Sequence, residues 1–218
     1  MMAALPFRPV PEAVLLRLRE ELDGLAAPPP IPPQEDPIWY RSAEFPPVVW
    51  QGLYEPRRHY LRGVIALKLR DATGLEAALG ALDFMAQSPG ADGTPEDAAT
   101  LARLLRVWGA RLTGEPIRAL GLLGAVRLPH RGVFETLVDY PRSCERFLRA
   151  EVYRRLGQAD EALDWYATFP DPTGHDLPYL APSFLRQAEI HEMLGDRDGA
   201  MRYYSRFLEL WTDADPAL

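Results

Sequence analysis

Two segments of this chain have nearly the same sequence, and this repetition limits the available folds more than any other feature. Residues 150–169 read AEVYRRLGQADEALDWYATF, and residues 188–207 read AEIHEMLGDRDGAMRYYSRF. Eight of the twenty aligned positions are identical, and apolar residues recur at helical spacing on both sides of a glycine. Each copy therefore predicts two amphipathic helices joined by a tight turn. Such a unit cannot bury its apolar faces alone, so we expect the copies to stack.

The helical pattern extends with short breaks over residues 59–211, and no segment alternates like a strand for long enough to compete. It predicts four helix pairs, at residues 59–87, 98–126, 142–169 and 183–211. Ala162 and Ala200 are small residues placed where two helices must approach closely. Gly157 and Gly195 each end a first helix, where a left-handed backbone conformation is needed.

The residues before the helix pairs divide into two parts. Residues 1–25 contain a predicted amphipathic helix at 11–25, because Pro11 suits a first turn and leucines share one face. Residues 26–56 include nine prolines among thirty-one residues, and proline fixes φ and lacks a backbone donor, so we expect an extended arm. The aromatic residues of this arm are predicted to bind a partner. They are Trp39, Tyr40, Phe45, Trp50 and Tyr54.

The small residue, the glycine turn, the next alanine and the tyrosine of each copy resemble the tetratricopeptide repeat, a helix–turn–helix unit of about 34 residues. The matching residues are Ala150, Tyr153, Gly157, Ala162 and Tyr166, then Phe184, Ala188, Gly195, Ala200 and Tyr204, with Gly114 and Ala119 in the second copy. Gly63 and Ala77 mark a degenerate first copy with an expected insertion in its turn. Phe169 and Phe207 replace the family's usual alanine, so we expect altered packing between repeats. The resemblance implies an all-α, tetratricopeptide-like stack of about four pairs in residues 57–218.

A narrower resemblance covers residues 56–218. Residues 62–82, 179–196 and 203–216 look like the tetratricopeptide region at the C-terminal end of multidomain bacterial kinases and transcription activators. The chain has neither the Gly-rich loop nor the catalytic loop of a kinase, so the resemblance does not bring that activity. It suggests an alternative function, a regulatory or sensor module that binds a peptide transiently.

Composition argues against several other function classes. The net charge is −7 without a basic cluster, which makes nucleic acid an unsuitable partner. Cys144 is the only cysteine, which excludes an internal disulfide and a cysteine zinc site. His191 and Glu192 lack the second histidine of a zinc-protease helix. We therefore expect no enzymatic activity, no cofactor and no metal.

The groove in which this repeat class grips extended peptides is the second predicted partner-binding surface. By the family's register, its positions in the last two copies are Phe147, Glu151, Arg154, Arg155, Leu185, Glu189, Glu192 and Met193. The family version that clamps a chaperone's carboxylates uses lysine and asparagine. This chain has no asparagine, and its one lysine, Lys68, lies in the degenerate first copy, so that version is excluded. The mixed residue types identify no ligand class.

Location and function follow from what remains. No apolar run approaches the ~20 residues that span a bilayer, and the N-terminus does not resemble a signal peptide, so we expect a cytoplasmic protein. The absence of a spanning helix does not exclude a second location, in which the chain binds a protein partner at the periphery of a membrane complex, such as a respiratory or photosynthetic one. Twenty-three arginines against one lysine are typical of a GC-rich bacterial genome. The sequence therefore predicts a non-catalytic scaffold or accessory subunit that binds other protein subunits of a bacterial assembly.

Overall fold

The computed structural model describes residues 9–25, 47–88, 95–124, 141–169 and 176–211, and within these ranges all regular structure is helical. Helix α1 spans Glu12–Gly24, as the sequence predicts. The other helices form consecutive pairs: α2 (Pro47–Leu69) with α3 (Ala72–Gln87), α4 (Pro95–Leu112) with α5 (Pro116–Gly124), α6 (Pro141–Arg155) with α7 (Ala159–Tyr166), and α8 (Leu177–Met193) with α9 (Arg197–Trp211). The prediction of an all-α protein with four helix pairs is confirmed.

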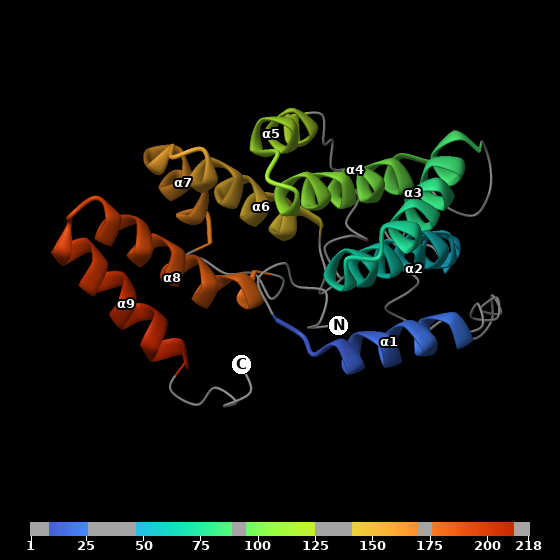
Figure 1. Cartoon of the computed structure of the whole chain (residues 1–218), viewed down its shortest axis with the longest axis horizontal. Coiled ribbons are helices and arrows are strands. Elements are labelled where there is room, and N and C mark those ends of the chain that lie inside the picture. Colours follow the sequence, from blue (N-terminus) through green and yellow to red (C-terminus); the bar gives the residue numbers. More distant parts are fainter. Residues whose placement is uncertain (1–8, 26–46, 89–94, 125–140, 170–175, 212–218) are drawn as a thin grey trace.

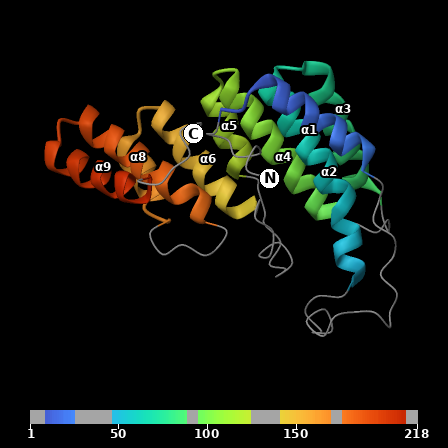
Figure 2. The ribbon, with the colours of Figure 1, turned by 90° about the horizontal axis from the view of Figure 1, so that it is seen from below.

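The pairs follow one another along the long axis of the molecule, with α2 and α3 toward one end and α8 and α9 at the other (Figures 1 and 2). The first helices of neighbouring pairs contact each other, α2 with α4, α4 with α6 and α6 with α8. The second helix of each pair also contacts the first helix of the next. The first helices therefore share one surface of the stack, which we call the first-helix face.

Helix α1 lies against α2 (Figure 1). Leu15 is buried, as expected for the apolar side of an amphipathic helix. Arg58 of α2 donates to the carbonyl oxygen of Leu22 over 3.0 Å, and Arg62 pairs with Asp23 at 2.5 Å. Arg58 thereby satisfies a carbonyl at the C-terminal end of α1, where the last carbonyls have no partner within the helix. These contacts attach α1 to the first pair of the stack.

All four pairs close their internal turn with the same backbone hydrogen bonds. The residue at the turn has a positive φ in each pair: 57° at Arg70, 77° at Gly114, 73° at Gly157 and 76° at Gly195. The next amide then donates to the carbonyl five residues earlier. These bonds join Asp71 to Ala66, Glu115 to Ala110, Gln158 to Tyr153 and Asp196 to His191. The shared closure is a Schellman motif, and it gives a common residue register for the four repeats.

This register corrects the sequence prediction for the first repeat. The turn between α2 and α3 is as short as the others, so the expected insertion is wrong. Arg70 stands where the other repeats have glycine, and Leu75 rather than Ala77 takes the place of the small alanine. Gly63 lies within α2, where an added Cβ would come within 2.4 Å of a methyl group of Leu105. Its role is therefore close packing between α2 and α4.

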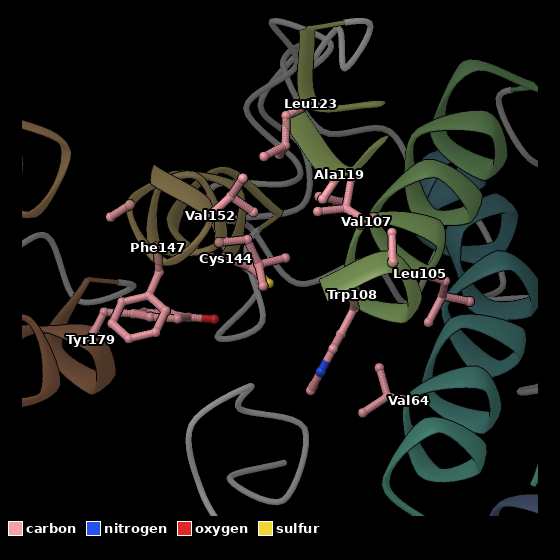
Figure 3. Packing of buried hydrophobic residues seen from close by; sticks show 14 of the residues in the cluster. Val64, Leu105, Val107, Trp108, Ala119, Leu123, Cys144, Phe147, Val152 and Tyr179 are labelled. Carbon is pink, nitrogen blue, oxygen red and sulfur yellow. The ribbon is translucent and has the colours of Figure 1, made fainter. Parts of the chain in front are cut away.

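The buried core runs through all four pairs, and Figure 3 shows part of it from α2 to α8. Ala162 is fully buried and Ala200 is 6% exposed, which confirms their predicted places in helix packing. Phe169, which replaces the family's alanine, lies 6.4 Å from Phe147 and 5.9 Å from Tyr179 between ring centroids. The phenylalanine ring, which is larger than the alanine it replaces, packs between Phe147 of α6 and Tyr179 of α8.

The predicted extended arm is wrong at its C-terminal end, because residues 47–56 belong to α2. Pro47 occupies the first position of the helix, where a backbone donor is not needed. Pro56 lies inside α2, and the burial of Tyr60 and Val64 in the same helix offsets its cost of about 3 kcal/mol. The remainder of the arm, including Trp39, Tyr40 and Phe45, lies outside the described residues.

Replacing Ala200 with Leu should destabilise the protein by about 1–3 kcal/mol, because the added atoms must fit between α8 and α9. Urea unfolding gives the free energy. The matched control is Ala77→Leu, at an exposed position of α3, which should change stability by less than about 0.5 kcal/mol. An unchanged midpoint for Ala200→Leu would contradict the packing of the last pair.

Replacing Arg70 with Gly should stabilise the protein by about 1 kcal/mol, because a left-handed conformation strains any residue with a Cβ. Gly157→Ala, at the equivalent turn, should destabilise by about 1–2 kcal/mol for the same reason. Both values come from chemical denaturation. Effects of the same sign at the two positions would contradict the common register.

Candidate partner-binding site

The structure separates the eight predicted groove residues into two groups. Phe147 and Glu151 are fully buried, so the prediction that they contact a partner is wrong for these two. The ring of Phe147 is enclosed by Tyr166, Phe169 and Tyr179, and Figure 3 shows it beside Tyr179. The half-buried or exposed positions are Arg154, Arg155, Leu185, Glu189, Glu192 and Met193.

The common turn register extends this comparison to the first two repeats. The positions equivalent to 147 and 151 are buried there too, and the position equivalent to the half-buried Arg154 is buried in both. They are Tyr60, Val64 and Leu67 in α2, and Leu104, Trp108 and Arg111 in α4. The position equivalent to Arg155 is half-buried at Lys68 and exposed at Leu112. Apart from Leu112 at the end of α4, the accessible part of the first-helix face is therefore concentrated at the last turn of α6 and along α8.

A buried carboxylate joins the elements around this accessible part. Oε2 of Glu151 lies 2.5 Å from Nη2 of Arg111, which comes from α4. Oε1 accepts a hydrogen bond of 2.6 Å from the Tyr166 hydroxyl on α7 and one of 3.0 Å from Nε of Arg186 on α8. Nε of Arg154 lies 3.5 Å from the same oxygen. One side chain of α6 thus contacts three other helices.

The charge state of Glu151 follows from these neighbours. Burial alone raises the pKa of the carboxyl group. The arginines at positions 111, 154 and 186 and the hydrogen bond from Tyr166 outweigh burial and lower this pKa to about 2. Burial and the nearby carboxylate raise the pKa of Tyr166, so its hydroxyl stays protonated and donates. Glu151 is therefore ionised at neutral pH.

The network continues from Glu151 toward the surface. Nη1 of Arg186 donates to both carboxylate oxygens of Glu189 over 2.9 and 2.8 Å. Arg155 donates to the backbone carbonyl of Arg111 at the C-terminal end of α4. Burial and the positive charge of Arg111 lower the pKa of Arg155. We call this set the Glu151 network, and its members are Arg111, Glu151, Arg154, Arg155, Tyr166, Arg186 and Glu189.

Sequence reasoning missed Arg111, Tyr166 and Arg186 as members of this site. The turn register contains a signal for one of them, since Arg111 lies three residues before Gly114 as Arg154 does before Gly157. Tyr166 appears in the sequence only as a packing residue. Nothing in the spacing of Arg186 indicates its bond to a glutamate 35 residues earlier.

Exposed apolar side chains also lie at this end of the molecule, at the last residue of α8, in the turn that follows and on α9. Five large hydrophobic residues there are at least half exposed: Met193, Leu194, Met201, Leu208 and Leu210. Isolated exposed hydrophobic residues are normal on a protein surface, whereas a concentration of them is typical of an interaction surface. The last pair therefore combines the accessible first-helix face with an apolar surface.

His191 is not arranged like a zinc ligand. Its ring stacks on Tyr203 with 5.3 Å between centroids, and Nδ1 lies 2.8 Å from a carboxylate oxygen of Asp196. Within the described residues, no group of three His, Cys, Asp or Glu side chains is placed to hold a metal ion. None of the described helices is long and apolar enough to cross a membrane.

The fold and the site together define an all-helical stack of paired helices with an accessible face at its last pair. Residues 183–213 match the family model of the tetratricopeptide repeat. The match begins within α8 and includes all of α9, so it covers the pair that carries the accessible face. No curated protein and no solved structure matches the chain. The match supports a tetratricopeptide-type protein and suggests an interaction module.

Replacing Glu151 with Gln should destabilise the protein by about 3–5 kcal/mol at neutral pH, because buried arginines lose their counter-charge. The lowered pKa of Glu151 means that its ionised form stabilises the fold above about pH 4.5, and this contribution is lost as pH falls toward 2. The difference between wild type and variant should therefore shrink over that range.

Urea unfolding at a series of pH values measures this difference. The control is Glu161→Gln, which removes a carboxylate from an exposed position of α7 and should have little effect at any pH. A difference that stays constant down to pH 2 would show that Glu151 does not titrate as the network requires.

Proposed function

We propose that this chain is a non-catalytic protein-interaction subunit, held as a scaffold or accessory part of a larger bacterial assembly. The observation that carries the proposal is the tetratricopeptide match over α8 and α9. This same pair exposes Glu192 and Met193 on the first-helix face. The positions equivalent to Glu192 are buried at Leu67 and Arg111 and half-buried at Arg154. Repeats of this class commonly bind an extended segment of another protein on that face.

Two properties support protein subunits as the partners. The exposed apolar residues of α9 offer a surface whose burial is favourable. The net charge of −7 disfavours nucleic acid, because phosphate contacts need a basic surface. The proposal includes assemblies at a membrane, reached through a protein partner. The aromatic residues predicted to bind a partner, Trp39, Tyr40, Phe45, Trp50 and Tyr54, remain a second predicted contact surface, and the last two of them belong to α2.

The experiment adds an affinity tag to the chain and purifies it from its own cells under native conditions. We expect the chain to elute with other subunits at fixed stoichiometry. Native mass spectrometry would then give a mass well above the 24.5 kDa of the chain. Met193→Asp should release the partner, because it places a charge on the exposed first-helix face of α8. The matched control is Phe84→Asp on α3, where the original side chain is similarly exposed (73% against 69%).

A wild-type chain that purifies alone would contradict the proposal. A partner that is captured but dissociates on dilution would favour the alternative of a peptide-binding regulatory module, related to kinase-linked or activator-linked repeats. Equal retention by both variants would place the contact elsewhere than on the first-helix face of α8.

A further inference from the structure

Arg154 is the least satisfied charged side chain of the Glu151 network. Its side chain is only 26% exposed, and its Nε is buried without a hydrogen-bond partner among the described residues. The nearest carboxylate oxygens are Oε1 of Glu151, 3.5 Å from Nε, and Oε2 of Glu189, 3.9 Å from Nη1. Both oxygens already accept shorter bonds from Arg186. Within the described residues Arg154 therefore has ion-pair contacts only, and the exposed part of its side chain is open to an acceptor from outside the chain.

Arg155, the next residue, adds donors at the surface. It is exposed, and the one hydrogen bond it makes with the described residues goes to the carbonyl of Arg111. The Glu151 network contains four arginines and two glutamates, so two positive charges are not balanced within it. Glu192, an exposed carboxylate of α8, accepts a 2.8 Å bond from the neutral hydroxyl of Tyr204 on α9 and keeps its own charge, so counting it leaves an excess of one positive charge. An excess of positive charge therefore lies at the last turn of α6, on a chain that is acidic as a whole.

We propose that Arg154 and Arg155 bind a carboxylate from an acidic segment of the partner protein. This inference rests on the proposed function and specifies the chemistry of its partner. The planar guanidinium presents paired donors that match a carboxylate, and partial burial strengthens such a bond. Glu151 holds Arg111 and Arg186 behind the site, so the ligand meets a fixed positive surface. Leu185 and Met193 are accessible apolar residues of α8 on the same first-helix face.

Fluorescence anisotropy tests this proposal with a labelled, flexible peptide that carries six glutamates separated by glycine and serine. The comparison peptide has glutamine in place of every glutamate. The double variant Arg154→Gln, Arg155→Gln should weaken binding of the glutamate peptide by about tenfold or more. The matched control is Arg118→Gln, Arg142→Gln, which removes two arginines from exposed positions outside the network and should change binding by less than about twofold.

A second variant gives a change in the opposite direction. Glu189→Gln removes one of the two carboxylates that compete for Arg154 and Arg186, so it should tighten binding of the glutamate peptide by about threefold. A purely structural role of the network predicts no gain. Circular dichroism and thermal unfolding establish that each variant is folded before its affinity is compared.

Three results would overturn the proposal. The first is equal affinity of the wild-type protein for the glutamate and glutamine peptides. The second is a loss in the Arg154 and Arg155 variant no larger than in its control. The third is displacement of the peptide by inorganic phosphate but not by acetate at equal ionic strength, which would indicate a phosphate site instead.

The native assembly distinguishes failure of this site from failure of the proposed function. If the Arg154→Gln, Arg155→Gln chain still purifies with its partner at full stoichiometry, the carboxylate site is wrong and the interaction function stands. If the wild-type chain purifies alone, the proposed function is wrong whatever the peptide shows.

Discussion

The buried carboxylate of Glu151 links three of the four helix pairs. An ionised group without water is costly unless charged and hydrogen-bonding partners replace its hydration. Here Arg111, Tyr166 and Arg186 provide these partners from α4, α7 and α8. Each bond constrains the position of a helix relative to α6. The arrangement of the last three pairs therefore depends on one side chain that the family register assigns to a binding groove.

A second connection fixes the N-terminal end of α8. The rings of Phe147 and Phe169 pack on Tyr179, and the Ser143 hydroxyl donates to Asp176 over 2.5 Å. The aromatic contacts act through burial, whereas the Glu151 network acts through charge farther along the same helix. Two separate connections resist rotation of α8 better than one. The accessible surface of the last pair is consequently held in a defined orientation to the arginines at the end of α6.

The features that could be predicted from sequence are the local ones. Glycine at positions 157 and 195 and alanine at 162 and 200 report directly on turns and helix packing, because each acts through its own backbone or size. The turn between α2 and α3 could not be located from sequence, because Arg70 adopts the left-handed conformation that is rare for a residue with a side chain. Proline content suggested an extended segment up to residue 56, but the first turn of a helix tolerates proline.

The candidate site was less predictable than the fold. The family register located the first-helix face, but accessibility along it depends on how closely successive pairs pack. That distance depends on large side chains such as Phe169, which contacts Phe147 in its own pair and Tyr179 in the next. The bonds of Arg111 and Arg186 to Glu151 join residues 40 and 35 positions apart. No periodic pattern marks such contacts, although they determine which charges reach the surface.

Native-state hydrogen exchange of the wild-type protein and its Glu151→Gln variant tests the central role of this carboxylate most directly. It reports the free energy of local opening for each helix separately. We expect the amides of α8 and α9 to lose far more protection in the variant than those of α2 and α3, because the Arg186 bond holds the last pair to α6. Equal loss of protection in all four pairs, or none in α8 and α9, would contradict this role of Glu151.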